Sequence, residues 1–600
     1  MITNLGIVVL AGIIIIICII YLIFDHRGNL NKIKGNKTGN GQYGTADWAT
    51  EKELRNTLNI IKYEPIAWRM GDNLPKIEGT VLGVKHTRKA LYAYVDSSDT
   101  HTLAVTASGG GKTTSLLYPN IEYNAALGCS FFCTDTKGGI FKDFIPILKE
   151  KYSYYCPVFD LRYPNKSNCY NLMGLVNKYM DLFMENKKLS DKAKSEAYAK
   201  NIGRTIIHSE GMKSYGQNQF FYDTAEAVIS AVTLLTAEFC PHSQRHIVSV
   251  FKLIRQLMEV DPSTINKKNP AATKLYLQQL YSMLPETHIC KDLLAPAATS
   301  EFKTMASIID TALSKLLSFI DSEIEQMICF DSEIDIEEFA KGRHAVFLVI
   351  DEKMGTRNFM VSLIYRQFYG ELIQTADMIK GNRLQKRVNF FMDEVGTHNP
   401  IEGLDEVFSA ARSRNIICMP LVQTTAQLTD KYGREKAKVI EANCQNLLFS
   451  FLSPLADDAN RFEKVLGNRT IQSGSVSHRA GNSRASSSTT YSMMKRPLMF
   501  PDEMTSDLEK GDWVLKHTGM KPAKMKLLKH EDWGITFNSE YEIESKADRP
   551  VKYASRAELM TEIQKKYPTR FYPTSSNKSS PIMSQSSKNE QLQIDPEYFS

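Results

Sequence analysis

The sequence predicts an α/β fold with an all-helical insertion and a single N-terminal membrane helix. Three observations support this prediction: short apolar runs that end at Gly- or Asp-containing loops, a central stretch with helical periodicity, and an uncharged apolar run near the start. At 600 residues the chain exceeds what one hydrophobic core organises, so we expect at least two folded regions.

The composition excludes several classes of protein. With 43% hydrophobic, 10% aromatic and 23% charged residues, the chain is not wholly disordered, collagen-like or a multi-span membrane protein. A net charge of +6 over this length does not by itself indicate a nucleic-acid binder. The ten cysteines are scattered and lack zinc-ligand spacing, so we expect buried reduced thiols and no disulfide framework.

The N-terminal apolar run extends from Gly6 to Phe24 without a charge. As a helix it crosses roughly 28 Å, which is about the thickness of one bilayer. Lys and Arg residues follow this run and none precedes it, which predicts an outside N-terminus and a cytoplasmic bulk, in the cell membrane. A cleaved signal peptide is the alternative, but the sequence lacks a basic n-region and a small-residue cleavage site. We expect no later stretch to span a membrane.

The remaining chain divides by its periodicity. Strand-like runs are predicted at 102–106, 130–134 and 157–161, and again at 345–350, 388–392, 416–421 and 447–451. The helical stretch between these two groups is therefore an insertion into one α/β domain. The predicted segments are the anchor (1–24), a juxtamembrane linker (25–42), the first part of the α/β domain (43–178), the all-α insertion (179–340), the second part of the α/β domain (341–545) and a polar tail (546–600).

Two Ser-rich segments, Ser473–Ser492 and Thr574–Lys588, are expected to be mobile. The first contains His478, Arg479 and Arg484, so it is either a solvated loop or a basic loop that touches nucleic acid.

The strongest motif is Leu103-Ala-Val-Thr-Ala-Ser-Gly-Gly-Gly-Lys-Thr-Thr114, a strand that leads through a Gly-rich loop into a helix. Glycines allow backbone N–H groups to wrap a polyphosphate, and the helix N-terminus adds partial positive charge. The predicted nucleotide contacts come from Ser108, Gly109, Gly110, Gly111, Lys112, Thr113 and Thr114. Lys112 would bind the β- and γ-phosphates of ATP, and Thr113 would bind Mg²⁺.

One position departs from the standard P-loop, because Thr106 stands where that pattern has its first glycine. The three consecutive glycines are expected to supply the conformational freedom instead.

A second motif, Val388-Asn-Phe-Phe-Met-Asp-Glu-Val395, is an apolar strand that ends in adjacent carboxylates. An NTPase needs such a pair beside its P-loop: Asp393 would hold the Mg²⁺ shell, and Glu394 would polarise the attacking water. Together the two motifs predict a P-loop ATPase.

These motifs, in their order along the chain, resemble those of the VirD4/TraG family of type IV secretion coupling proteins, the membrane-anchored ATPases of conjugation. The resemblance runs from Tyr43 to about Trp533. It includes Tyr43–Ala49, Asp135-Thr-Lys-Gly138, Tyr170-Asn-Leu172 (with Leu172 in place of a proline), Phe220–Ala225, Ala411-Arg-Ser-Arg414, Val422-Gln-Thr-Thr-Ala-Gln-Leu428, Asn443-Cys444 and Arg496-Pro-Leu498.

The resemblance implies a RecA-like motor that assembles as a ring, expected to be a homohexamer, with ATP at the subunit boundaries. It implies that Arg412 reaches a neighbour's γ-phosphate, with Arg414 as the competing candidate, and that Gln423 senses the γ-phosphate. Asp135 and Lys137 would lie near the same edge without an assigned role. It also implies cargo docking on the helical insertion, and these partners: a relaxase or relaxosome, single-stranded DNA gripped through its phosphates without base reading, and the type IV secretion channel.

Many relatives carry two membrane helices before the motor, whereas one is expected here. The function alternatives are an FtsK-like DNA translocase, a docking adaptor for secreted proteins, and a non-hydrolysing scaffold. Lys112, Asp393 and Glu394 argue against the scaffold, and the Ser-rich C-terminus shows no DNA-reading helix-turn-helix pattern.

Overall fold

A computed structural model describes residues 6, 9, 11–20, 37–88, 90–208, 216–264, 274–351, 357–479, 486–546 and 548–568. Its centre is a 12-stranded mixed sheet with the order β1-β3-β2-β14-β13-β10-β4-β9-β8-β5-β7-β6. The strands are β1 (Asn59–Lys62), β2 (Thr80–His86), β3 (Leu91–Asp96), β4 (Thr102–Val105), β5 (Ser130–Asp135), β6 (Val158–Asp160), β7 (Ala345–Val349), β8 (Val388–Met392), β9 (Ile416–Val422), β10 (Asn446–Phe449), β13 (Asp512–His517) and β14 (Ala523–Lys526).

Seven neighbouring strands, from β10 to β6 in the sheet order, are parallel. Each of the seven begins within one residue of its predicted run, because a strand buried on both faces is a short continuous apolar run. The carboxyl ends of β4, β9, β8 and β5 therefore share one edge of the sheet, which we call the catalytic edge.

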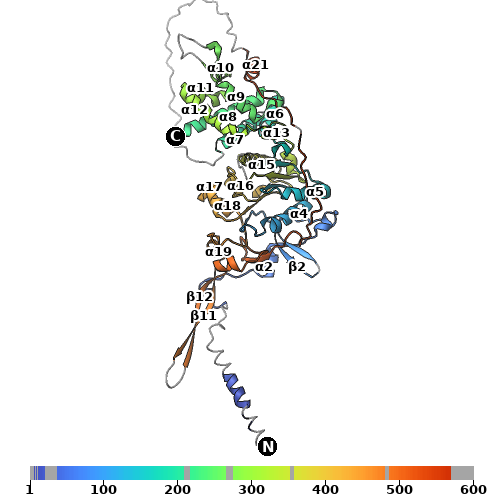
Figure 1. Ribbon diagram of the computed structural model, residues 1–600, viewed down its shortest axis with the longest axis vertical. Coiled ribbons are helices and arrows are strands. Elements are labelled where there is room, and N and C mark those ends of the chain that lie inside the picture. Colours follow the sequence, from blue (N-terminus) through green and yellow to red (C-terminus); the bar gives the residue numbers. More distant parts are fainter. Residues whose placement is uncertain are drawn as a thin grey trace, which may run out of the picture.

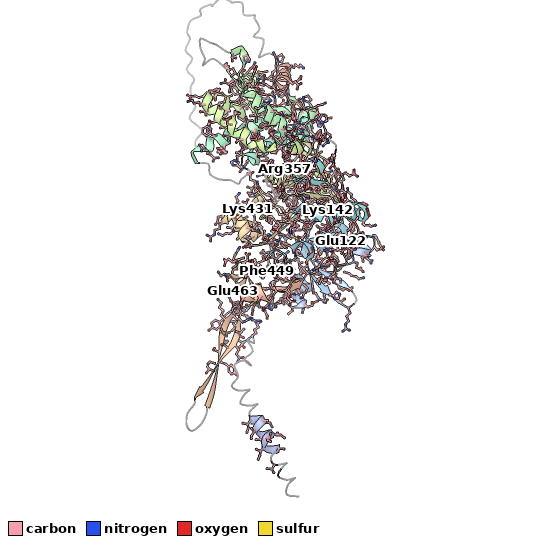
Figure 2. The ribbon with its side chains drawn as sticks, viewed as in Figure 1. Glu122, Lys142, Arg357, Lys431, Phe449 and Glu463 are labelled. Atoms are coloured by element: carbon pink, nitrogen blue, oxygen red, sulfur yellow. The ribbon has the colours of Figure 1, made fainter. Side chains whose placement is uncertain are left out.

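Two hydrophobic cores cover the two faces of the sheet. Side chains alternate along β5, so Phe131 packs in one core and Phe132 in the other. The core of Phe131 also contains α4 (Tyr118–Leu127), α5 (Ile140–Tyr152) and the antiparallel strands. Glu122 of α4 is fully buried there and forms an ion pair with Arg69, at 2.7 Å (Figure 2). This pair holds the N-terminal α3 (Pro65–Trp68) against α4.

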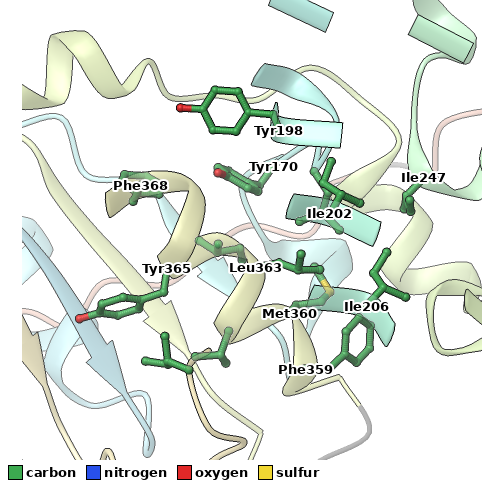
Figure 3. Packing of buried hydrophobic residues seen from close by; sticks show 14 of the residues in the cluster. Tyr170, Tyr198, Ile202, Ile206, Ile247, Phe359, Met360, Leu363, Tyr365 and Phe368 are labelled. Carbon is green, nitrogen blue, oxygen red and sulfur yellow. The ribbon is translucent and has the colours of Figure 1, made fainter. Parts of the chain in front are cut away.

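The other face carries α15 (Phe359–Met378), which joins the sheet to the helical insertion. Figure 3 shows Phe359, Leu363 and Phe368 of α15 beside Tyr198 and Ile202 of α7. The insertion helices are α6 (Gly174–Asn186), α7 (Leu189–Ile207), α8 (Gln219–Phe239), α9 (Ile247–Leu257), α10 (Tyr276–Met283), α11 (Ile289–Ala298), α12 (Phe302–Leu316), α13 (Ser322–Ile328) and α14 (Ile336–Ala340). They gather at one end of the molecule (Figure 1). The predicted fold class, an α/β domain interrupted by helices, is confirmed.

Polar contacts hold the insertion to the sheet domain. The carboxylate of Glu371, on α15, is buried and accepts hydrogen bonds from the hydroxyls of Tyr179 (2.7 Å) and Tyr198 (2.5 Å). Arg357, labelled in Figure 2 between the sheet and the helices, pairs with Asp321 beside α13 at 2.5 Å. Satisfied polar groups of this kind fix one geometry between packed elements.

The second part of the sheet domain contains α16 (Leu404–Ala410), α17 (Ala426–Tyr432), α18 (Arg434–Asn443), α19 (Asp458–Leu466) and α20 (Pro501–Ser506). Its last segment runs along the side of the molecule to the helical end (Figure 1). Along this path the Tyr541 N–H donates to the carbonyl of Lys142, and the Arg549 N–H donates to the side-chain oxygen of Gln326. The helix α21 (Arg556–Lys566), inside the predicted tail, then packs on the insertion.

The Ser-rich segment 473–492 was expected to be a loop, and this expectation is wrong for the residues that the structure describes. They lie in a two-stranded antiparallel hairpin of β11 (Asn468–Arg479) and β12 (Ser486–Pro497). Thr, Val, Ile and Tyr are interspersed among the serines and favour extended backbone, a signal that the low-complexity interpretation ignored. The second Ser-rich segment, 574–588, lies outside the described residues.

Within the predicted anchor, residues 11–20 are helical and solvent-exposed, and most of the rest lies outside the described residues. The expectation that no later stretch could span a membrane is wrong by length and composition, because α8 meets both criteria. That helix is 67% buried inside the insertion over its most apolar window. All ten cysteines are free and eight are buried, as expected.

Candidate active site

The Gly-rich loop connects β4 to a π-helical turn, η2 (Lys112–Leu117), that continues into α4. Gly109 (φ 79°) and Gly111 (φ 92°) adopt left-handed backbone, which residues with a Cβ disfavour. The loop is held at its start, where the N–H of Ala107 donates to the carbonyl of Phe451 at 3.1 Å. Its end is the N-terminus of η2, whose first N–H groups lack intrahelical acceptors and favour an anion.

Thr106, the departure from the standard P-loop, lies under this loop. A Cβ placed on Gly110 would come within 2.0 Å of the Thr106 hydroxyl oxygen. That oxygen is buried and has no hydrogen-bond partner in the part of the chain that the structure describes. The threonine therefore occupies the space that a side chain at position 110 would need, so the middle glycine is required for reasons of space and the outer two for their backbone conformation.

The acidic strand end meets the Gly-rich loop at the catalytic edge. The Lys112 Nζ lies 3.0 Å from the Glu394 Oε1, and both side chains are largely buried. The Gln423 Nε2, at the end of β9, lies 3.2 Å from the Glu394 Oε2. Glu394 itself has a positive φ of 51°, a strained conformation for a residue with a side chain and one that occurs at functional sites. Three of the predicted catalytic residues thus form one network around the Glu394 carboxylate.

Asp393, the predicted cation ligand, is buried at the catalytic edge. Burial, and secondarily the neighbouring Glu394, raise the pKa of the Asp393 carboxyl to about 7. Its Oδ1 is buried and accepts no hydrogen bond from any described residue, although its backbone carbonyl accepts one from the Thr134 hydroxyl at 3.0 Å. A buried carboxylate oxygen without a donor fits a divalent cation that neutralises it. A cluster of three or more His, Cys, Asp or Glu side chains suited to a metal is absent from the described residues.

The remaining predicted nucleotide contacts surround this centre. Ser108 and Gly109 are exposed at the tip of the loop, and Thr113 and Thr114 are half-buried at the start of η2. The hydroxyl of Thr113, next to Lys112, is the second group on this chain suited to Mg²⁺.

Arg412 and Arg414 lie at the opposite edge of the sheet, before β9 begins at Ile416. The seven residues of β9 span about 23 Å, so neither arginine reaches Glu394 of its own chain. The two differ in their contacts. The Arg414 Nε lies 3.2 Å from the Asp377 Oδ1, whereas the half-exposed Arg412 guanidinium has no partner among the described side chains.

Asp135 and Lys137 do not join the network. The buried Asp135 carboxylate accepts the N–H groups of Gly138 (2.7 Å) and Phe141 (3.1 Å), so it shapes the loop after β5. Lys137 is exposed.

Two supporting contacts were not predicted. The Gln427 Oε1 accepts the N–H of Gln423 at 2.9 Å, and the N–H of Thr425 donates to Asp458, at 3.2 Å. Gln427 lies within a motif already singled out, but nothing in the sequence marks Asp458, which is 33 residues from its partner. A cavity of about 520 Å³ lies between α18, α19 and β10 and is lined by Thr425, but by no residue of the Gly-rich loop.

The chain is similar to known proteins of type IV secretion. A model of the family "Type IV secretory system Conjugative DNA transfer" matches residues 48–551. The type IV secretion system-coupling protein VirD4 of Bartonella quintana (strain Toulouse) is 20% identical over 522 residues, covering 82% of this chain and 73% of the relative. VirD4 of Bartonella henselae is 21% identical over 472 residues, covering 75% and 66%. Among solved structures, the plasmid coupling protein TrwB in complex with the non-hydrolysable ATP analogue ADPNP has a TM-score of 0.50 at 14% identity, covering 86% of this chain and 99% of the solved chain.

Proposed function

Because the chain belongs to the type IV secretory system conjugative DNA transfer family, we propose that it is a membrane-anchored ATPase that delivers a relaxase–DNA substrate to a type IV secretion channel. One observation carries the enzymatic part: the 3.0 Å contact between Lys112 and Glu394, which joins the Gly-rich loop to the acidic strand end. The curated relatives are named as coupling proteins, and TrwB was solved with an ATP analogue, which supports the same assignment.

Each residue of the catalytic edge has its own role in the proposed reaction. Lys112 and the loop N–H groups bind the β- and γ-phosphates, and Thr113 and Asp393 hold the cation. Bound magnesium supplies positive charge beside the phosphates. Glu394 accepts the proton of the attacking water, and Gln423 holds that carboxylate in place.

The Lys112–Glu394 ion pair joins the two halves of the proposed site. The lysine that would bind the phosphates contacts the carboxylate that would accept the proton, so both groups lie within reach of one triphosphate.

The arginines support a ring. Since Arg412 lies about one strand length from its own catalytic edge and has no partner among the described side chains, we assign it to the nucleotide of a neighbouring subunit. An arginine suits this role because its planar donors stabilise charge that spreads over the phosphoryl oxygens. We propose that the ring is a homohexamer, as the resemblance to the VirD4/TraG family implies.

The insertion helices have a proposed role in the transfer of the relaxase–DNA substrate. We assign cargo docking to the insertion helices, at the end of the molecule remote from the juxtamembrane segment (Figure 1). Single-stranded DNA would be held through its phosphates, because a pump that moves any sequence gains nothing from reading bases.

Lys112→Ala and Glu394→Gln test the proposal. Each is expected to lower ATP turnover at least about 100-fold and to abolish DNA transfer between cells, while the protein stays folded and in the membrane. A matched control is available on α18, where Lys438 and Glu435 also lie 3.0 Å apart but are exposed. Lys438→Ala and Glu435→Gln are expected to leave turnover and transfer unchanged. Normal transfer from either catalytic-edge variant refutes the motor assignment.

A further inference from the structure

The β11–β12 hairpin carries most of the net charge of the chain. Between Asn468 and Pro497 the sequence has five Lys or Arg residues and no Asp or Glu, whereas the whole chain has a net charge of +6. One of the five, Arg496, is neutralised by an ion pair with Glu503 outside the hairpin. An acid-free, basic segment of 30 residues complements an anionic surface.

The hairpin projects from the body of the molecule beyond α19 (Figure 1). Each strand has 12 residues, so the ribbon is about 40 Å long. A two-stranded ribbon on its own is only marginally stable in water, which favours a surface that covers one of its faces.

The base of the hairpin is bound to the juxtamembrane segment. The N–H of Thr38 donates to the carbonyl of Thr470 at 3.2 Å, and that of Ala46 donates to Asn468 at 2.8 Å. Gly39 packs so closely on Met493 that an added Cβ would lie 2.6 Å from its sulfur. Twelve residues, 25–36, separate this segment from the end of the apolar run. Fully extended, they span at most about 43 Å, so the hairpin base lies within that distance of the bilayer.

The described side chains of β12 suit a membrane surface. Every second residue of β12 lies on the same face of the strand. One face carries Tyr491 (61% exposed), Met493 (42% exposed) and the exposed Lys495. Tyrosine combines an apolar ring with a polar hydroxyl, and lysine reaches from an apolar stem to a charged head, so both are enriched where lipid meets water. Nucleic acid would satisfy the charge as well, but it would not explain the attachment to the juxtamembrane segment.

We propose that the β11–β12 hairpin docks on the anionic phospholipid headgroups of the cytoplasmic leaflet and orients the motor on the membrane. The proposal rests on the membrane anchor of the proposed function. Basic residues bind such a leaflet with an affinity gain of about fivefold per charge, and salt screens this attraction.

Hydrogen exchange of the full chain in lipid nanodiscs tests this contact. Amides within 468–497 are expected to exchange at least about fivefold more slowly in discs with 30% phosphatidylglycerol than in phosphatidylcholine discs, and 0.5 M NaCl should remove the difference. The double variant Arg479→Glu, Lys495→Glu should lose the protection. The matched control Lys341→Glu, Lys565→Glu reverses two exposed lysines outside the hairpin and should keep it.

Equal exchange in the two lipids overturns the proposal. Protection that appears in phosphatidylcholine discs only when single-stranded DNA is added also overturns it and makes the hairpin a nucleic-acid contact instead. Protection by inorganic phosphate alone would show an ion site that needs no bilayer. A chain that fails to stay in any disc refutes the anchor rather than the hairpin contact, and ATP turnover, measured in parallel, reports on the motor independently.

Discussion

Gly110→Ala is a perturbation whose effect is determined by one other side chain. Gly110 has no positive φ, so alanine is allowed by the backbone, but its methyl group would lie 2.0 Å from the Thr106 hydroxyl oxygen. A normal contact needs at least about 3.0 Å, so the loop or the Thr106 side chain must shift by about 1 Å. The loop resists this shift, because Thr106 and Ala107 donate to the carbonyls of Val422 and Phe451. Overpacking of this kind costs about 1–3 kcal/mol, which corresponds to nucleotide binding that is about 5- to 150-fold weaker.

Thr106→Gly, which restores the standard pattern, should remove the conflict. Alone it is expected to be neutral within about 1 kcal/mol, since the added backbone freedom is offset by the loss of a buried, unpaired hydroxyl. Combined with Gly110→Ala it should recover most of the lost affinity, because the nearest remaining atom outside residue 106 is the carbonyl oxygen of Ala107 at 3.1 Å.

The assay is equilibrium titration of a fluorescent ATP analogue against the two single variants and the double variant, with thermal unfolding measured alongside. Gly139→Ala is the matched control, because Gly139 lies beside the same edge and has no atom within 4 Å of an added Cβ. Normal nucleotide binding by Gly110→Ala refutes the reasoning. An equal loss in the presence and absence of Thr106 assigns the effect to the main chain of Gly110 instead.

Two further predictions concern the acid and the arginines. Since the pKa of Asp393 is about 7 in the folded chain and 3.8 in the unfolded one, the folded state binds more protons between these values. The stability that this group contributes is present at low pH and is lost as the pH rises through 7. Melting temperatures of the nucleotide-free protein should therefore fall from pH 5 to pH 8, and less so in Asp393→Asn. Arg412→Ala should bind ATP normally yet not hydrolyse it, and mixing it with Glu394→Gln subunits should restore some turnover; no rescue at any ratio would show that the arginine does not act between subunits. Arg414→Ala removes a half-exposed ion pair and should retain turnover.

The parallel half of the sheet was predictable and the antiparallel half was not, for a physical reason. Strands such as β5 and β8 are buried on both faces and read as continuous apolar runs. Among the antiparallel strands, β14 reads Ala-Lys-Met-Lys with only its first and third residues buried. Such a pattern is common in loops, and the strand is specified by its neighbours β2 and β13, which are far away in the sequence.

The candidate site shows the same division. The glycines, Lys112 and the Asp393–Glu394 pair were identified because their chemistry requires fixed spacing within one segment. The position of Thr106 under Gly110 was not predictable, since the sequence identified the substitution but not the direction of its side chain. Asp458 was missed altogether, because its role as acceptor for Thr425 depends on how α19 packs against the end of β9.

Hydrophobic length alone did not distinguish a membrane helix from a core helix in this chain. A helix that is apolar on all sides must be covered by protein or by lipid. The helix α8 meets the length test, but α7, α11 and α12 pack on it, and its buried Thr236 hydroxyl is satisfied by the carbonyl of Val232 at 2.7 Å. In the N-terminal helix, by contrast, Ile13–Ile17 are 49–58% exposed, and no described element covers them. Five consecutive isoleucines exposed in this way fit the membrane anchor proposed for this chain, and this observation is independent of the charges that follow the apolar run.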